Sequence, residues 1–286
     1  MDINDFRTFI EVSRTRHFGQ SARNLCITQS AVSARIRQLE EALGKPLFIR
    51  QRNNIQLTPA GEQLLSYAEI ITTAWNSARQ TIGVSEKDSI SVQVGGMPGL
   101  WDIILQDWLH YIYAENEKLI IHAEIQGTDM LHRRILNGTL DIAFVYEAPV
   151  NDKLGVKAIA DIPLKMVSSI ANKTANEATA GDYIMVDWGT SFLNGHAQSF
   201  PDMPAPMLHT DLGRIAFNFI MHNGGSAYLA DPMFSEYIEQ GKLHLVKDAP
   251  AFERTAYAIY CEDNEKKEFI VQLLDTMEQT TLTDIE

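Results

Sequence analysis

The first part of the chain contains three short stretches in which apolar positions recur with a helical period. The clearest runs from about Ser30 to Leu43, and it predicts a helix because its apolar residues are separated by 4, 3 and 4 positions. Gly44 follows at the place of a helix C-terminal cap. The apolar positions of the three stretches are Phe6, Phe9 and Ile10, then Ala22 and Leu25, and finally Val32, Ile36, Leu39 and Leu43. We therefore expect three helices here.

Two short runs typical of strands come next. Residues 47–50 and 54–57 flank Gln51, Arg52 and Asn53, and asparagine tolerates the left-handed backbone conformations of a tight turn. Three helices followed by a small hairpin make a winged helix-turn-helix. We expect this domain to occupy residues 1–58.

A long helix is predicted directly after the hairpin. Thr58 and Pro59 form a strong helix start, a hydroxyl at the N-cap followed by proline at the first helical position. The apolar residues beyond them, separated by 4, 3, 4, 3 and 4 positions, are Leu64, Ala68, Ile71, Trp75, Ala78 and Ile82. This heptad seam predicts that residues 59–88 link the domains and pair two chains. The same spacing also suits a helix that packs on its own domain.

From Ser89 onward, strand-like runs alternate with helical stretches. The expected strands are Ser91–Gly95, Leu119–Ile125, Asp141–Val145, Leu164–Ser168, Tyr183–Val186, Ala227–Ala230, Leu243–Val246 and Ala256–Tyr260. The expected helices are Leu100–Ala114, Met130–Leu136, Leu212–His222 and Lys266–Met277. Such alternation favours an α/β body with largely parallel sheets. We expect two lobes that share a cleft, one of residues 89–160 and 262–286 and one of residues 161–261, in a chain that is α+β overall.

The net charge hides a division between these parts. Hydrophobic residues make up 45% of the 286 residues and charged ones 21%, which excludes a disordered chain. The formal net charge is −13. Residues 1–61, however, carry nine basic and five acidic side chains, whereas the remainder carries 15 basic and 32 acidic ones. A small basic module on a large acidic body indicates a nucleic-acid contact confined to the module.

The cysteines and the N-terminus indicate a reducing compartment. Two cysteines, Cys26 and Cys261, cannot form a disulfide framework. The sequence begins with acidic residues where a signal peptide needs basic ones, and no apolar run approaches the ~20 residues of a membrane span. We expect a cytoplasmic protein without a membrane partner.

The third predicted helix carries the groups that suit DNA. If its apolar residues face inward, Gln29, Ser33 and Arg37 form an exposed stripe with Ser30 beside it, and glutamine and arginine match the edges of adenine and guanine. Arg35 lies at the flank, where it suits a phosphate, and Arg50 and Arg52 at the hairpin suit a neighbouring backbone or the minor groove. The alternative interpretation is a helical bundle whose arginines are merely solvated.

Residues 9–62 resemble the DNA-binding segment of LysR-type transcriptional regulators. The matching positions are Thr28, Gln29, Ser30, Ala31, Ser33, Ile36, Leu39, Glu40, Leu43, Gly44, Leu47, Phe48, Arg50, Leu57, Thr58 and Gly61. The resemblance implies that a homodimer or homotetramer binds double-stranded operator DNA through Thr28, Gln29, Ser30, Ser33, Arg35, Arg37, Arg50, Arg52 and Asn53. Ala34 stands where many members have arginine, so the base contact made there in other members is not expected here.

The resemblance extends over essentially the whole chain. In this family the C-terminal part resembles a periplasmic binding protein, which implies two α/β lobes with a small-molecule effector between them. Runs such as Asp187-Trp188-Gly189 are similar to a branch of the family that controls flagellar genes. The resemblance therefore implies transcriptional regulation, with flagellar genes as a guess at the target.

Three predicted loops locate the effector site. Each follows a strand and opens a helix, where free backbone N–H groups favour an anion or a polar ligand head. The expected effector-binding residues are Met97, Pro98, Gly99, Leu100 and Trp101, then Gly127 and Thr128, then Trp188, Thr190 and Ser191, with Ser226 from a further turn. Trp101 and Trp188 could instead fill the core, which is commoner for tryptophan.

Catalysis and simple ligand carriage are the competing classes. The sequence has no Gly-x-Ser-x-Gly elbow, no His-x-x-x-His pair, no dinucleotide or phosphate-binding glycine motif and no metal-ligand spacing, so we expect no enzyme, cofactor or metal. The alternative function is a cytoplasmic small-molecule receptor without direct gene control. The basic module argues against it.

Overall fold

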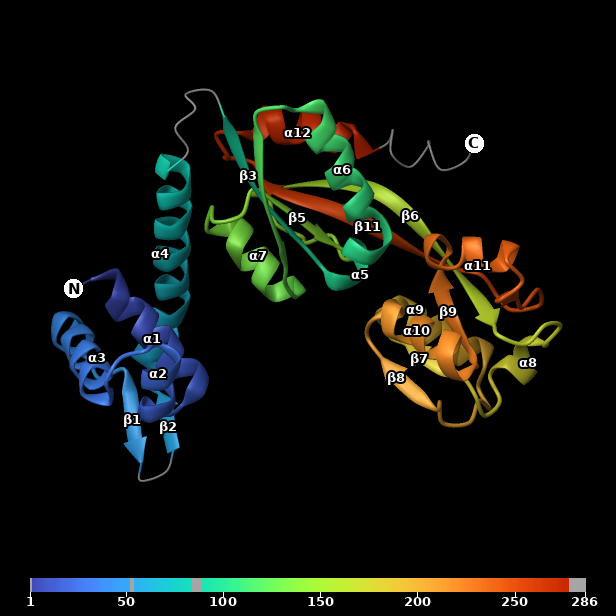
Figure 1. The fold of residues 1–286 in the computed structure, drawn as a ribbon, viewed down its shortest axis with the longest axis horizontal. Coiled ribbons are helices and arrows are strands. Elements are labelled where there is room, and N and C mark those ends of the chain that lie inside the picture. Colours follow the sequence, from blue (N-terminus) through green and yellow to red (C-terminus); the bar gives the residue numbers. More distant parts are fainter. Residues whose placement is uncertain (1, 52–53, 84–88, 278–286) are drawn as a thin grey trace. The chain divides into compact units, whose positions relative to one another are not determined.

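A computed structural model of the chain describes residues 2–51, 54–83 and 89–277. The chain divides into two compact units, Met1–Ser89 and Ile90–Glu286. The first contains α1 (Ile3–Thr15), α2 (Phe18–Asn24), α3 (Gln29–Leu43), β1 (Phe48–Gln51), β2 (Asn54–Leu57) and α4 (Pro59–Gly83). The three short helices and the antiparallel hairpin confirm the predicted winged helix-turn-helix (Figure 1).

Local chemistry sets the helix ends of the first unit. The Asp2 side chain accepts from the Asn4 N–H at the start of α1, and Thr28 Oγ1 accepts from the Ala31 N–H at 3.2 Å at the start of α3. Gly44 ends α3 in the left-handed conformation at φ 64°. Thr58 Oγ1 accepts from the Gly61 N–H at 3.0 Å, as its predicted N-cap role requires. The predicted apolar stripe of α3 is buried at Val32, Ile36 and Leu39, whereas Leu43, predicted to be buried with them, is 46% exposed at the last position of the helix.

The body starts at Ile90 and alternates strands with helices. Its first half contains β3 (Ile90–Gly96), α5 (Pro98–Leu100), the π-helical turn η1 (Trp101–Leu105), α6 (Gln106–Glu115), β4 (Leu119–Ile125), α7 (Thr128–Leu136), β5 (Ile142–Val145) and β6 (Leu154–Ser168). Its second half contains α8 (Ala175–Ala178), β7 (Ile184–Val186), α9 (Thr190–Ser199), β8 (Leu208–Thr210), α10 (Gly213–Asn223), β9 (Ser226–Ala230), the 3₁₀ turn η2 (Asp231–Met233), α11 (Ser235–Glu239), β10 (His244–Leu245), β11 (Phe252–Cys261) and α12 (Lys267–Asp275).

The sheet of the body corrects the prediction of largely parallel strands. Its order is β10-β6-β11-β5-β3-β4, with β9 paired to β6. Among the described strands of this sheet, only β3 with β4 and β3 with β5 are parallel, and the pairs that involve β6 or β11 are antiparallel. A separate two-stranded sheet of β7 and β8 is parallel as well. The alternation of strands and helices could not reveal this, because β6 and β11 lie far apart in the sequence and pair directly.

These two antiparallel strands join the lobes. β6 is 15 residues long and β11 is 10, and both continue from the β3–β5 sheet into the second lobe (Figure 1). The sequence indicated only the second part of β6. The register between β6 and β11 shifts between Ala256 and Tyr257, and Tyr257–Ile259 pair with β5 of the first lobe. The chain thus returns from the second lobe to the first within β11, before the expected boundary at residue 261.

Two faces of the first-lobe sheet pack against different helices. Ile142 and Phe144 of β5 belong to the same core as Trp108 of α6 and Leu273 of α12, whereas Ala143 packs with α7 on the other side. In the second lobe, α9 and α10 pack around β7 and β9. β8 was not expected from the sequence, whereas α9 is the helix that the loop at Trp188 was expected to open. None of the described helices is long and apolar enough to cross a membrane.

Candidate functional site

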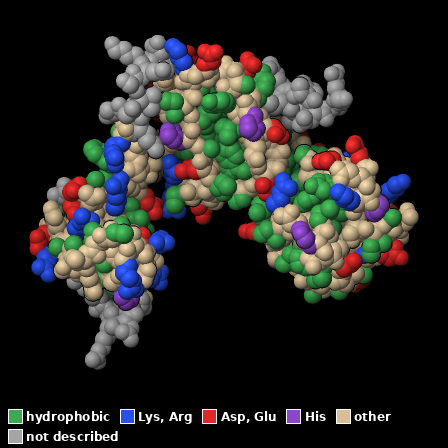
Figure 2. All heavy atoms as spheres, viewed as in Figure 1, with side chains coloured by type: hydrophobic (Ala, Val, Ile, Leu, Met, Phe, Trp, Pro, Cys, Tyr) green, Lys and Arg blue, Asp and Glu red, His purple; other side chains and the backbone are tan. Residues whose placement is uncertain are grey.

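The predicted recognition stripe lies on the surface of α3. Thr28, Gln29, Ser30 and Arg37 are exposed, and Ser33 is half-buried between them. The opposite side of the helix is buried in the domain core. This face can therefore approach a base edge without any rearrangement of the fold. Figure 2 shows several Lys and Arg side chains on the visible face of this unit, with Asp and Glu side chains among them.

Arg35 is placed differently from the rest of the stripe. Its guanidinium donates from Nη1 to Thr8 Oγ1 at 3.2 Å, and Thr8 is buried in α1. Arg35 therefore connects α3 to α1. A phosphate would have to share this guanidinium with Thr8.

The wing carries the remaining predicted contacts. Arg50 lies on β1, but its side chain is outside the described residues, as are Arg52 and Asn53 entirely. Glu40, at a position of the matching motif, fixes the start of the wing, because its Oε1 accepts from the Leu47 N–H at 2.8 Å. The hairpin is thus tied to α3.

The exposed face of α4 differs from the predicted seam. Ala68 is fully buried against its own domain and Leu64 is half-buried there, so the prediction was wrong for Ala68. Ile71 and Trp75 are 40% and 49% exposed, and Ala78 is exposed as well. Tyr67, which the sequence did not single out, is 63% exposed. The heptad spacing combined two faces, one intramolecular and one free; the side chain of Ile82 lies outside the described residues.

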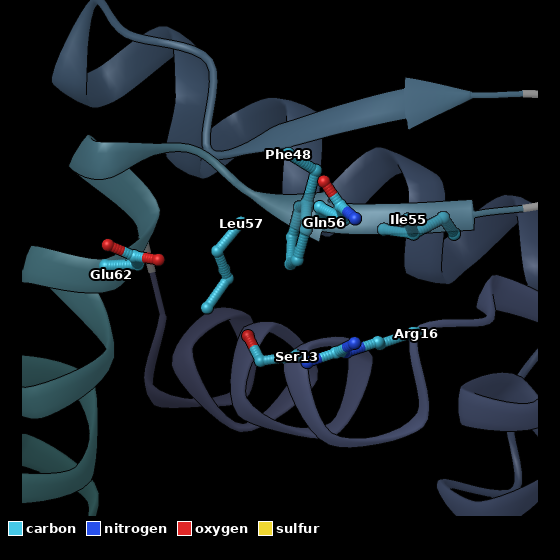
Figure 3. A pocket seen from close by; sticks show the side chains of 7 residues that line it. All are labelled: Ser13, Arg16, Phe48, Ile55, Gln56, Leu57 and Glu62. Atoms are coloured by element: carbon cyan, nitrogen blue, oxygen red, sulfur yellow. The ribbon is translucent and has the colours of Figure 1, made fainter.

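A hollow of about 210 Å³ lies elsewhere in the same unit. Figure 3 shows it between α1, the wing and the start of α4, and its lining residues are Ser13, Arg16, Phe48, Ile55, Gln56, Leu57 and Glu62. None of these is a predicted contact. Ligand pockets usually measure about 300–1,000 Å³, so this hollow is a poor candidate for the effector site.

In the body, two of the three predicted loops meet directly. Thr128 Oγ1 donates to Met97 Sδ at 3.3 Å, and the Gln126 N–H donates to the Gly96 carbonyl at 3.2 Å. Gly127 precedes α7 and Thr190 and Ser191 open α9, in both cases without a side-chain cap on the helix. The free N–H groups that suit an anion are therefore present at both helix starts.

Three predicted residues of these loops fill the core instead. Leu100 is fully buried, and Trp101 is 8% exposed with Nε1 donating to the Glu124 carbonyl at 3.0 Å. Trp188 is 4% exposed, and its Nε1 donates to the Tyr228 carbonyl at 2.9 Å. The tryptophans thus pack their rings in each lobe and satisfy their N–H groups internally.

Ser226 does not lie with the loops. It starts β9 and pairs with Ser168, whereas the other end of β9, Ala230, pairs with Leu164. Ser226 is also bridged to Tyr183, which precedes β7, while the loop at Trp188 follows β7. The predicted effector role of Ser226 was therefore wrong, because the direction of β9 puts it at the opposite end of the strands. Its buried Oγ has no hydrogen-bond partner among the described residues.

The sequence missed two residues that connect the loops. Arg254 of β11 lies over the ring of Tyr146, 4.3 Å from its centroid, and its guanidinium contacts Gly189 before α9. The Tyr146 hydroxyl packs on Gly99, where an added Cβ would lie 2.8 Å from the oxygen. Arg254 and Tyr146 thus join the first loop to the third. No local signal marked Arg254, because it stands between Glu253 and Thr255 and precedes the expected strand Ala256–Tyr260.

Charge pairs also cross between the lobes. Arg214 Nε of α10 lies 3.8 Å from Asp102 Oδ1 of η1, and η1 contacts η2.

Burial raises the pKa of the Tyr146 hydroxyl well above its usual value, so it stays protonated. The same effect lowers the pKa of Arg254, although nearby Tyr146, Glu147 and Asp187 oppose it. Among the described residues no cluster of His, Cys, Asp and Glu could hold a metal.

Family models match both units. The description "Bacterial regulatory helix-turn-helix protein, lysR family" matches residues 3–62, and "LysR substrate binding domain" matches residues 86–281. A relative from Yersinia enterocolitica named HTH-type transcriptional regulator HdfR is 36% identical over 288 residues, which cover 96% of each chain. A protein of the same name from Yersinia pestis is 35% identical over 285 residues, again 96% of each chain.

Solved structures agree in fold. The LysR family transcriptional regulator CbnR superposes with a TM-score of 0.73 at 14% identity, over 98% of this chain and 99% of CbnR. Full-length CbnR complexed with its target DNA gives 0.71 at 16% identity, over 98% and 100%. DarR of Vibrio fischeri, also in complex with DNA, gives 0.58 at 18% identity, over 97% and 99%.

Proposed function

This chain belongs to the LysR family of bacterial transcriptional regulators, and we propose that it binds a two-fold-related operator as a homo-oligomer under the control of a small-molecule effector. It is a regulator and not an enzyme. The observation that carries the operator proposal is the exposed face of α3, on which Gln29 and Arg37 are free of the domain core. Bidentate side chains of these types suit base edges in the major groove.

Two copies of the chain would present two such faces. The exposed apolar residues of α4, with Tyr67, Ile71 and Trp75 at their centre, supply a surface that a second α4 can cover. A pair related by a two-fold axis would place its α3 helices in major grooves about one helical turn, or a multiple of it, apart. A tetramer built from two such pairs is equally compatible with this surface. Because the operator lies on the chromosome, the regulator would work in the cytoplasm.

The effector would bind between the lobes of the body. The loops at Met97 and Gly127 meet in the first lobe, the loop at Thr190 opens a helix of the second lobe, and Arg254 contacts residues from both sides. A ligand there would change the free-energy difference between open and closed lobes only if it binds one arrangement better than the other. The change would reach the DNA through the angle between paired units.

Mapping the DNA bound in the cell tests the operator proposal. We expect discrete sites with two-fold-related halves for the wild type, and loss of these sites for the double variant Gln29→Ala with Arg37→Ala. Flagellar genes are the first targets to examine. If the wild type shows no discrete sites and binds random and enriched DNA equally in vitro, a small-molecule receptor without gene control becomes the better assignment.

A thermal-shift screen of small metabolites tests the effector proposal separately. A ligand that binds only the folded chain raises its melting temperature. We expect at least one metabolite to stabilise the full-length protein and to alter its affinity for the mapped operator. A regulator whose stability and operator affinity respond to no ligand would contradict this part of the proposal.

A further inference from the structure

Arg254 is unusual among the arginines of the body. It lies inside β11, opposite Ile162 of β6, where the two strands pass from one lobe to the other. Only 15% of its side chain is exposed. Tyr146 covers one side of the guanidinium, and the Gly189 backbone contacts it from the second lobe. The cation is therefore held in a fixed place between the lobes.

Among the described residues, this guanidinium has no hydrogen-bond acceptor. Within the part of the chain that the structure describes, none of its N–H groups donates a hydrogen bond, and its nearest carboxylate oxygen, Glu147 Oε1, is 3.9 Å away. A guanidinium has five N–H donors, and leaving buried donors without acceptors is costly. The Tyr146 hydroxyl beside it is likewise buried without a partner. Two unpartnered polar groups at one place indicate that an acceptor from outside the chain completes them.

The neighbouring acids do not fill this role. Asp187 accepts from the Gly189 N–H at 2.8 Å and is thereby held in its own loop. Glu147 is 73% exposed, so it can turn into solvent at little cost. Asp102 faces Arg214. Arg254 can therefore accept one further anionic group, whereas these acids make a multiply charged anion unfavourable.

We propose that Arg254 is the anchor for a small carboxylate effector, whose carboxylate pairs with the guanidinium in place of Glu147. This inference rests on the proposed effector site between the lobes and names the class of ligand it takes. A carboxylate matches the planar fork of arginine with two parallel hydrogen bonds. Since Arg254 touches both Tyr146 and Gly189, the same ligand would link the first lobe to the second.

The test compares matched ligands on the full-length protein. Acetate and benzoate are titrated by calorimetry and thermal shift beside acetamide and benzamide, with succinate and inorganic phosphate as multiply charged anions. We expect at least one carboxylate to bind the wild type better than its uncharged amide. Arg254→Gln should weaken that binding about tenfold or more, because it removes a charge-assisted pair in a partly buried place.

Three further variants make the result specific. Glu147→Gln should bind the carboxylate more tightly, since it removes the internal competitor. Arg254→Lys keeps the charge without the fork and should give an intermediate affinity. Arg133→Gln, which removes an exposed arginine of α7, should bind like the wild type. Circular dichroism and operator affinity establish that each variant is folded.

Two results would overturn the inference. One is that no carboxylate of the panel distinguishes the wild type from Arg254→Gln; the other is that phosphate or an amide binds in preference. Binding of such a ligand without dependence on Arg254 would leave the proposed effector function intact. Failure of the operator proposal would instead appear in the DNA mapping.

Discussion

On α3 the candidate contacts face solvent, whereas in the body the comparable groups lie half-buried between strands and loops. Gln29, Ser30 and Arg37 are exposed along one helix, and Arg254 is enclosed by segments from both lobes. A charge in water contributes little by itself, so a surface that binds a polyanion needs several, while one charge in a low-dielectric site suffices for a small ligand. The difference in burial thus corresponds to the size of the ligand.

The exposed face of α4 gives the first test of this comparison, because it decides whether one or two α3 helices contact the same operator. Replacing Ile71 and Trp75 by Glu should give monomers by light scattering, since charges would replace the apolar residues that a second copy covers. Operator affinity should fall by about 10²-fold or more, as two linked contacts become one. Binding of ligand to the body should stay unchanged.

Gln63→Glu adds a charge at another exposed position of α4 and is the control. We expect it to remain an oligomer. An oligomer that survives the Ile71 and Trp75 substitutions would mean that this face packs elsewhere in its own chain. The comparison between two α3 faces paired through α4 and the enclosed Arg254 site would then fail.

The recognition surface itself is examined by Arg37→Ala. If Arg37 reads a base, specific operator affinity should fall by about 1–3 kcal/mol. Affinity for random DNA should change far less, because the phosphate contacts remain. Competition binding assays with both DNAs measure the ratio.

Arg14→Ala serves as the comparison for this variant. Arg14 is 68% exposed and pairs with Glu11 at 2.8 Å, on a helix outside the predicted recognition surface. We expect it to change specific and random binding by the same small factor. An unchanged specificity ratio for Arg37→Ala would remove the base-reading role from this residue.

The same contrast explains what could be predicted from the sequence. The first unit is fixed by local signals, such as the Thr28 cap, the left-handed Gly44 and the Thr58-Pro59 helix start, and each acts within a few residues. The stripe of α3 followed from the same helical period. Two details were wrong: Leu43 at the end of α3 is exposed, and the apolar spacing of α4 combined a buried face at Ala68 with an exposed one at Ile71.

The body depends on contacts that no local pattern contains. The loops at Met97 and Thr128 were found because a helix start after a strand is a local feature. Ser226 was misplaced because the direction of β9 is decided by its pairing with β6. Arg254 and Tyr146 meet only because β11 pairs with both β5 and β6. The candidate site therefore depends on the register between distant strands, which a local sequence pattern does not display.

The smallest expected effect is a difference between the two units in how their stability depends on pH. His196 of α9 is 2% exposed, and its Nε2 lies 2.9 Å from the Tyr183 hydroxyl in an aromatic cluster of the second lobe. Burial lowers its pKa below the usual 6.5. Below pH 6.5 the unfolded chain therefore binds a proton that the folded body does not. The stability of the body falls as the pH is lowered, until the folded-state pKa of His196 is reached.

The first unit should respond only in more acid solution. Glu11 accepts a hydrogen bond from Arg14, which lowers the pKa of its carboxyl below the usual 4.5. The stability linked to Glu11 is thus complete above pH 4.5 and is lost as the pH falls further. Between pH 7.5 and 5.5 only the body should lose stability. Its free energy of unfolding should fall by at most about 1.4 kcal/mol per pH unit below pH 6.5.

His196→Gln separates this histidine from the other groups of the body. The amide can still bond to Tyr183 but does not titrate, so the variant should lose less stability than the wild type between pH 7.5 and 5.5, whatever its stability at the higher pH. His222→Gln, at an exposed position of α10, should keep the wild-type pH dependence. Parallel slopes for the wild type and His196→Gln would mean that the acid response of the body arises elsewhere, and burial would then no longer distinguish how the two units respond to pH.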